Sequence, residues 1–222
     1  MPAAILIDGA YFIKRFRQIE PHNAYNPQRM ADMAFRYALM HLTDKAIKHP
    51  LYRIFFYDCP PVEKKMHNPI SKVSVDFAKS QEAIFRKELH EHLKRKRKLA
   101  LRLGHLAHAD WALKPEAEAS LLKGKLAFED LTEADVALDV RQKGVDMRIG
   151  LDIASLTFKK QVSKIVLMAG DADFVPAAKL ARREGIDFVL DPMHKRIPDD
   201  LNEHIDGLRS VCARPAPRKL VS

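Results

Sequence analysis

Short apolar runs separated by longer amphipathic segments constrain the fold of this chain most strongly. Four of these runs, Ala3–Ile7, Tyr52–Tyr57, Ile165–Met168 and Ile186–Leu190, have the length and the continuous hydrophobicity of buried strands. Strands that are apolar on both faces and that alternate with helices are typical of a parallel sheet covered on both sides. The sequence therefore predicts an α/β fold with a central, mainly parallel sheet flanked by helices.

The remaining segments are assigned from their periodicity and their end signals. Helical spacing of apolar residues predicts five helices, at Met30–Ile47, Phe77–Lys98, Val145–Thr157, Phe174–Glu184 and Pro198–Leu208. The stretch Leu99–Leu113 alternates enough to indicate a strand or a hairpin, and Asp135–Asp139 is interpreted as a loop or a short helix.

Composition sets limits on the class of protein. With 222 residues, 47% of them hydrophobic, the chain can bury one sizeable core. We expect a single domain over residues 1–210, with a basic helical and strand insertion at about 60–113 and a flexible tail at 211–222. No apolar run approaches the roughly 20 residues of a membrane span, and the N-terminus lacks the features of a signal peptide. Two cysteines without metal-ligand spacing favour a cytoplasmic protein.

Aspartates follow two of the predicted strands directly. Asp8 comes after the first strand, and Asp171 and Asp173 come after the third. Asp146 stands at the start of the helix that precedes the third strand, and Asp152 lies further along the same helix. In parallel α/β sheets, ligands bind outside the carboxyl ends of the strands. If the first and third strands are neighbours, these carboxylates converge at one edge of the sheet.

Converging carboxylates repel one another unless a positive group joins them. Lysine or arginine side chains can supply that charge, and a divalent cation is the other usual answer. Mg²⁺ prefers oxygen ligands and is typically held by one or two carboxylates together with waters and substrate phosphates. A cation bound in this way polarises a phosphodiester and activates water. The aspartates are therefore best explained as metal-facing groups.

Each aspartate also has a simpler explanation. Asp173 precedes a helix and serves equally well as an N-cap, and Asp146 does so in its own helix. Asp8 before a glycine is an ordinary turn residue, and Asp152 falls on a helix face that solvent would cover as readily as a metal. The combination favours the metal site, because separate turn and cap signals do not require acids at two strand ends and one helix start together.

Three segments resemble the signature blocks of the NYN domain, in its PIN-like, bacterial LabA-type group. They are "ILIDGAYF", "QKGVDMRIGLDIASL" and "VLMAGDADFVPAAKLARREGIDFVL", in the order and spacing of that family. The resemblance implies a PIN-like three-layer fold with a mainly parallel sheet, and ribonuclease activity that depends on Mg²⁺ or Mn²⁺. It also implies which residues form the acidic catalytic and metal site: Asp8, Asp146, Asp171 and Asp173, with Asp152 as an accessory metal ligand.

Two positions depart from the pattern of the resembled family. Many relatives carry Asn where this chain has Tyr11, and many carry Ser or Thr where it has Ala169. An amide or hydroxyl that helps to position water or substrate is therefore absent at both places. The acidic residues remain, so nuclease activity stays the first interpretation, with rate and metal affinity open.

Basic residues indicate how a polyanion would be held. The net charge is +9 and the sequence pI is about 9.5, which suits association with nucleic acid. Five consecutive cations form the end of the predicted helix Phe77–Lys98, where they would point around most of its circumference, and two more precede Asp146. We expect these seven side chains to bind the RNA backbone, against the alternative of a solvated helix end: Lys94, Arg95, Lys96, Arg97, Lys98, Arg141 and Lys143.

The sequence thus predicts a metal-dependent endoribonuclease whose partner is RNA. The alternative is a catalytically weak RNA-binding or regulatory protein on the same fold. A phosphatase of the haloacid dehalogenase type is a poorer hypothesis, because the first strand lacks a second Asp two residues after Asp8. We expect no membrane association, and a homo-oligomer is left open.

Overall fold

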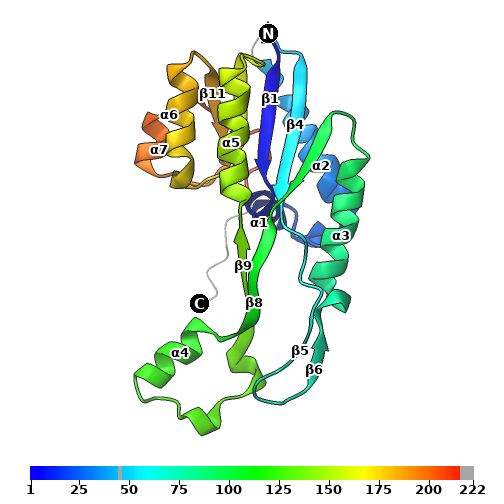
Figure 1. Ribbon diagram of the computed structural model, residues 1–222, viewed down its shortest axis with the longest axis vertical. Coiled ribbons are helices and arrows are strands. Elements are labelled where there is room, and N and C mark those ends of the chain that lie inside the picture. The colour runs from blue at the N-terminus through cyan, green and yellow to red at the C-terminus, as the bar shows by residue number, and fades with distance from the viewer. Residues whose placement is uncertain (45–46, 216–222) are drawn as a thin grey trace.

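A six-stranded parallel sheet forms the centre of the computed structural model, which describes residues 1–44 and 47–215 (Figure 1). Every neighbouring pair in this sheet is parallel. The strands, in spatial order, are β12 (Gly207–Leu208), β11 (Asp187–Asp191), β10 (Lys164–Met168), β1 (Ala3–Asp8), β4 (Leu51–Asp58) and β7 (Leu99–Leu103). The predicted α/β architecture with a central parallel sheet is confirmed.

Helices cover both faces of the sheet, so the fold has three layers. One face carries α1 (Gly9–Ile19), α2 (Pro27–Met40) and α3 (Gln81–Lys94), and the other carries α5 (Val145–Phe158) and α6 (Val175–Arg183). Alternate residues of each strand serve the two faces, because successive side chains of a strand point to opposite sides. In β1, for example, Ala3, Ile5 and Ile7 pack under α1 and α2, whereas Ala4 and Leu6 pack under α5.

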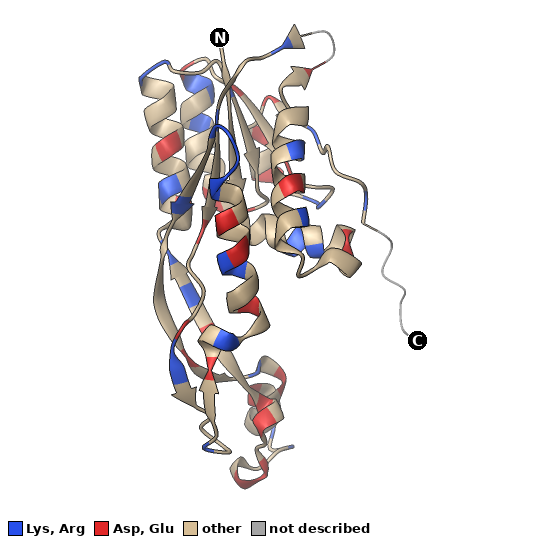
Figure 2. Cartoon of the chain, turned by 90° about the vertical axis from the view of Figure 1, so that its right-hand side faces the viewer, with Lys and Arg blue, Asp and Glu red and all other residues tan. Residues whose placement is uncertain are grey.

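A distal lobe, made of residues 60–80 and 105–143, projects away from the sheet (Figure 1). Its main support is an antiparallel pair, β8 (His105–Leu113) with β9 (Val136–Lys143). It also holds the pair β5 (Lys65–His67) and β6 (Ser74–Asp76), a 3₁₀ turn at Phe77–Lys79, and α4 (Pro115–Leu122). Acidic residues gather at its far end (Figure 2), so a polyanion gains little there. The expected organisation, a single domain with an insertion at 60–113, stays a prediction.

Two predicted helices are shorter than their apolar pattern suggested. The helix expected at Met30–Ile47 ends at Met40, and two very short strands follow, β2 (Thr43–Asp44) and β3 (Ile47–Lys48). The helix expected at Phe77–Lys98 begins at Gln81, where Ser80 caps its N-terminus through Ala83 N–H, and it ends at Lys94. The basic run therefore leaves the helix after its first residue.

Three other segments differ in kind. Leu99–Leu113 forms strands, as one of its two predicted alternatives requires, but not a hairpin, since β7 joins the central sheet while β8 pairs with β9. The predicted loop or short helix at Asp135–Asp139 is wrong from Val136 onward, where β9 runs beside β8. The last predicted helix, Pro198–Leu208, is confined to α7 (Asp199–Glu203) and is followed by β12.

Two further features bear on the expected environment and ends of the chain. Within residues 1–44 and 47–215, no helix combines the length and the apolar character needed to cross a membrane. The expected tail at 211–222 lies outside the described residues from 216 onward, and Cys212 is buried.

Candidate active site

The parallel register brings the C-terminal ends of β1, β10 and β11 to one edge of the sheet, which we call the carboxyl edge. Ile7 is opposite Met168, and Met168 is opposite Asp191, so the three strands end at the same level. Asp8 ends β1, while the loop after β10 leads through Gly170 to Asp171. The adjacency of the first and third predicted strands, on which the convergence of the aspartates depends, is thus confirmed.

Asp8 is both a helix cap and a strongly perturbed carboxyl. Its Oδ1 accepts a hydrogen bond from Tyr11 N–H at 3.1 Å, which caps the first turn of α1. The pKa of Asp8 is raised to about 6, mainly by burial and to a lesser extent by the charges of Asp146 and Asp58, against the lowering effect of the Tyr11 hydrogen bond. A carboxyl that is this costly to ionise is suited to face a cation.

Asp146 is the second residue of α5 and faces the aspartates of the next loop. Gly144 precedes the helix with a φ of 82°, a left-handed conformation that glycine adopts readily. Partial burial raises the pKa of Asp146, and the charges of Asp171 and Asp173 raise it further. Asp8 is therefore affected by the charge of Asp146, and Asp146 is affected by the charges of the two aspartates in the loop after β10.

Asp171 and Asp173 occupy a 3₁₀ turn, Ala172–Phe174, between β10 and α6. Asp171 Oδ1 accepts a hydrogen bond from Asp173 N–H at 3.2 Å, so the cap of this turn is Asp171. Asp173 is not the N-cap of α6, because Phe174 holds that position. Both carboxylates are exposed at the carboxyl edge, and neither forms an ion pair with a cation among the described residues.

Asp152 has protein partners. Its Oδ2 accepts a hydrogen bond from Tyr57 Oη at 2.8 Å and lies 3.4 Å from Arg102 Nε. These two contacts tie α5 to the ends of β4 and β7, and they account for the carboxylate without a metal. Its accessory metal role stays a prediction that this geometry does not favour.

Two further acids lie at strand ends, and both are bound by protein side chains. Asp58, at the end of β4, is fully buried between Arg86, with which it forms an ion pair, and His90, whose Nε2 lies 2.8 Å from Asp58 Oδ2. Asp191, at the end of β11, is fully buried with its Oδ2 2.8 Å from His41 Nε2. Their position at strand ends, the same signal that singled out Asp8, would have found them.

The donor chemistry fits a hard divalent cation, although no complete protein cage is formed. Asp8, Asp146, Asp171 and Asp173 offer only oxygen atoms, and their mutual repulsion is relieved by positive charge. Among residues 1–44 and 47–215, no group of three or more His, Cys, Asp or Glu side chains is arranged to hold a metal ion. The arrangement therefore suits a cation bound by one or two carboxylates, with water and substrate completing its coordination.

The predicted basic residues lie in two places. Lys98 precedes β7, and its carbonyl accepts from Ile54 N–H at 2.9 Å, so the run from Lys94 to Lys98 lies at the opposite edge of the sheet, which we call the amino edge. Arg141 and Lys143 are in β9, which leads directly into Gly144 and the start of α5. Of the seven cations predicted to bind the RNA backbone, these two are therefore the ones that lie near the aspartates along the chain.

Three of the five cations of the basic run have partners within the protein. Lys94 Nζ lies 2.6 Å from Glu91 Oε1, Lys96 pairs with Asp32, and Lys98 Nζ donates to the carbonyl of Leu51 at 2.6 Å. Lys98 has a φ of 59°, so the chain turns sharply there. The description of five cations around one helix is wrong for Arg95 to Lys98, and RNA binding by the run stays a prediction.

Tyr11, one of the two departures, fills the space between the acidic site and the next loop. Its hydroxyl donates to the carbonyl of Pro192 at 2.7 Å. A Cβ at Gly170 would lie 2.7 Å from the Tyr11 ring, so glycine permits this close approach. Ala169 is fully buried. Tyr11 thus replaces a potential site amide with a packing and anchoring role.

Comparison with known proteins identifies the family. The model of the NYN domain matches residues 56–206, which include Asp146, Asp171 and Asp173, while Asp8 lies before the matched segment. No curated protein sequence matches the chain significantly. A crystal structure of a protein of unknown function from Vibrio parahaemolyticus is 13% identical, with a TM-score of 0.45, and the similarity covers 95% of this chain and 92% of that one. Because the family match spans more than half of its length, this chain belongs to the NYN domain family.

Proposed function

We propose that the protein is a metal-dependent endoribonuclease that hydrolyses RNA phosphodiester bonds at Asp8, Asp146, Asp171 and Asp173, with Mg²⁺ or Mn²⁺ as cofactor. NYN domains are typically nucleases. The observation that carries the proposal is that these four carboxylates, from the ends of two adjacent parallel strands and from the start of α5, are electrostatically coupled at one edge of the sheet. The pKa of Asp8 is raised by Asp146, and the pKa of Asp146 is raised by Asp171 and Asp173.

The coupling argues for a ligand because the fold leaves the repulsion uncompensated. Elsewhere at the same edge, Asp58 is paired with Arg86 and His90, so the fold does neutralise acids that serve only packing. A divalent cation bound at the four aspartates would neutralise them and supply a Lewis acid for the phosphodiester. The carboxylates themselves hold that charge in place and orient water by accepting hydrogen bonds.

RNA affinity requires separate groups, because an acidic cluster repels a polyanion. Arg141 and Lys143 precede the start of α5 and are exposed, so we assign them phosphate contacts beside the site. The run from Lys94 to Lys98 is at the amino edge and can contact only RNA that extends well beyond the site. This division assigns chemistry to the acids and sequence-independent affinity to the cations.

The proposal is tested by incubating purified protein with fluorescently labelled single-stranded and hairpin RNA. Parallel reactions contain Mg²⁺, Mn²⁺, EDTA, or EDTA followed by excess Mn²⁺, and matched DNA strands test the preference for RNA. We expect internal cleavage of RNA that needs the metal and that returns when the metal is restored. Cleavage that persists in EDTA would overturn the metal requirement, and an absence of cleavage under all conditions would overturn the nuclease assignment.

One observation favours the alternative, a catalytically weak RNA-binding or regulatory protein. Asp8 and Asp171 each accept a backbone hydrogen bond as a cap, and no group of three metal-ligating side chains is preformed in the described residues. Tyr11 and Ala169 also remove polar groups found in many relatives. Salt-sensitive RNA binding without cleavage, in the same assay, would establish this alternative.

A further inference from the structure

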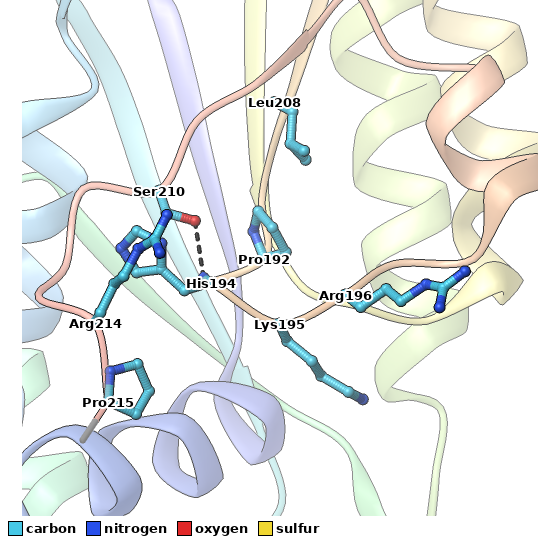
Figure 3. Close-up of a pocket in the computed structure, with 8 residues that line it drawn as sticks. All are labelled: Pro192, His194, Lys195, Arg196, Leu208, Ser210, Arg214 and Pro215. Atoms are coloured by element: carbon cyan, nitrogen blue, oxygen red, sulfur yellow. Dashed lines mark hydrogen bonds between the residues drawn. The ribbon is translucent and has the colours of Figure 1, made fainter. Parts of the chain in front are cut away.

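A basic cavity opens at the carboxyl end of β11 (Figure 3). It has a volume of about 610 Å³, and its wall includes Lys195, Arg196 and Arg214, together with His194 and Ser210. The first two cations come from the loop after β11, and Arg214 comes from the segment after β12. None of these residues was singled out by the sequence patterns, because the cations are few and are separated along the chain.

The loop that presents Lys195 and Arg196 is held firmly. Tyr11 Oη donates to the carbonyl of Pro192, and Arg15 donates to the carbonyl of Met193 through Nε at 3.2 Å and Nη2 at 2.6 Å. On the other side, Ser210 Oγ accepts from His194 N–H at 2.9 Å. Its two cations are therefore carried on a scaffold fixed by hydrogen bonds from both sides.

The backbone of this loop is also strained. Met193 and His194, which are consecutive and are not glycine, have φ angles of 47° and 61°. Such conformations cost free energy and persist only where surrounding contacts impose them. Buried Asp191 supplies one of these contacts, since its Oδ1 accepts from Met193 N–H at 2.7 Å. The strain accompanies the sharp turn that places Lys195 and Arg196 at the surface.

The three cations have no acidic partner in the part of the chain that the structure describes. No carboxylate lies within ion-pair distance of Lys195, Arg196 or Arg214 among residues 1–44 and 47–215. Lys195 Nζ lies 5.7 Å from the centre of the Tyr11 ring, a weak contact that leaves its charge free. Figure 3 shows the side chains of Lys195 and Arg196 diverging from each other, an arrangement that suits successive anionic groups better than one small anion.

The cavity and the aspartates are close along the same edge. Asp8, Ala169 and Pro192 follow aligned residues of three adjacent strands, so the backbones of Asp8 and Pro192 are two strand spacings, roughly 10 Å, apart. Tyr11 connects them physically, because its N–H donates to Asp8 and its hydroxyl donates to Pro192. A single extended polyanion can therefore contact both places.

We propose that the basic cavity of Lys195, Arg196 and Arg214 binds phosphates of the same RNA strand that is cleaved at the aspartates. These phosphates neighbour the phosphodiester that lies at the four carboxylates. The inference rests on the proposed function, since it names a second contact region for the same substrate. RNA would then cross the carboxyl edge from Arg141 and Lys143 on one side to this cavity on the other. Its unpaired cations offset the repulsion between the strand and the four carboxylates, and contacts to phosphate fix the position of the strand without reading its sequence.

The test compares two double variants that remove the same charge. Lys195→Gln with Arg196→Gln alters the cavity, and Lys159→Gln with Lys160→Gln alters two exposed cations at the amino edge, after α5. Affinity for a labelled single-stranded RNA is measured by fluorescence anisotropy in EDTA over a salt series, so that cleavage does not interfere. Circular dichroism checks that both variants are folded, which we expect because all four side chains are exposed.

We expect the cavity variant to bind more weakly and to lose salt dependence, while the amino-edge variant follows the wild type. Each lost phosphate contact changes the slope of log affinity against log salt by about 0.7 for single strands, so two contacts change it by about 1.4. Equal slopes for the two variants would overturn the inference, even if the wild type cleaves RNA. A flattened slope in the cavity variant supports the inference even if the wild type never cleaves, and a wild type that does not bind RNA overturns both proposals.

Discussion

The two edges of the central sheet differ in how their charged side chains are paired. At the amino edge, Lys96 pairs with Asp32, and buried Lys164 lies 3.0 Å from Asp187 and 3.5 Å from Asp44. At the carboxyl edge, the site carboxylates and the cations of the basic cavity lack partners of opposite charge among the described residues. Within the part of the chain that the structure describes, exposed cations such as Lys159 and Lys160 are unpaired at the amino edge too, so what distinguishes the carboxyl edge is that unpaired acids and unpaired cations lie beside one another there, which we take as the sign of a ligand.

The carboxyl edge contains the same contrast on a smaller scale. Asp58 and Asp191 are fully buried and have side-chain partners, Arg86 and His90 for Asp58 and His41 for Asp191. Asp171 follows β10, which lies between β11 and β4 in the sheet, and within residues 1–44 and 47–215 its carboxylate accepts only from a backbone N–H. Both groups are strand-end aspartates, so sequence position alone does not separate an acid used for packing from one available to a ligand.

The largest effect is expected for Asp171→Asn. Asparagine keeps the cap on Asp173 N–H and removes only the charge, so folding should be unaffected while RNA cleavage falls by more than about 100-fold, since even residues that merely support a metal ligand are worth about 10- to 100-fold. Initial rates with Mn²⁺ measure the effect, and Asp32→Asn, at the amino edge, is the control. Cleavage by the Asp171 variant at the wild-type rate would remove this residue from the site.

Asp58→Asn, in contrast to Asp171→Asn, should cause a large loss of stability. It removes the buried one of the two carboxylate partners of Arg86, which keeps only Glu82, whose Oε1 lies 2.8 Å from Arg86 Nε. Breaking a buried pair on one side typically costs about 3–5 kcal/mol, and the remaining partner places the expected loss toward the lower end of that range. Urea unfolding, compared with Asp32→Asn, gives the change in the free energy of unfolding. A variant as stable as the wild type would show that Asp58 is not a structural acid, and the division between paired and unpaired aspartates would fail.

The elements predicted best from sequence are those whose local pattern and tertiary role agree. β1, β4, β10 and β11 are continuously apolar because both faces are covered, and the family resemblance then orders the acids that follow them. Helix ends were less predictable, since the apolar spacing of α2 continues beyond Met40 although the chain leaves the helix at His41. α1 and α4 were not predicted, although Phe12, Ile13 and Phe16 of α1 are buried at helical spacing; α4 has only eight residues, and Ala117 is its one buried residue.

Two errors have a common physical origin, the choice of partner for a strand. Val136, Leu138 and Val140 alternate with more polar residues, a strand signal that the acidic composition of this segment obscured. β8 pairs with β9 across more than twenty intervening residues instead of with β7, and such long-range pairing leaves no local mark. The basic cavity was missed for the same reason, because Arg196 and Arg214 meet only through the fold.

Asp8→Asn tests the unpaired acids of the carboxyl edge through the pH dependence of stability. Burial raises the pKa of the Asp8 carboxyl to about 6 in the folded protein, so ionising it opposes folding. Below about pH 4 the group is protonated in both states and contributes nothing; as pH rises through 6, the wild type loses stability of up to about 3 kcal/mol that the variant keeps. Asparagine is an equally good N-cap, so the Tyr11 hydrogen bond is preserved.

The measurement is urea unfolding of both proteins from pH 4 to pH 8 without divalent metal. We expect the variant to be the more stable at pH 8 and equal to the wild type near pH 4. In saturating Mn²⁺ the wild type should recover the difference, because a cation bound to the folded state alone adds stability by mass action. A stability difference that does not depend on pH would show that the carboxyl of Asp8 does not have a raised pKa in the folded protein.

The smallest effect is expected for the basic run at the amino edge. The six residues of β1 separate the two edges by roughly 20 Å, about two Debye lengths at 0.1 M salt. Replacing Lys94, Arg95 and Arg97 by Gln, while keeping Lys96 and Lys98 with their structural contacts, should therefore leave the salt slope for a short RNA at the carboxyl edge unchanged. Longer RNA that extends across the molecule should become less salt-dependent in this variant. Anisotropy over a series of RNA lengths measures both effects, and a slope that flattens equally for the shortest RNA would show that the strand is held at the amino edge instead.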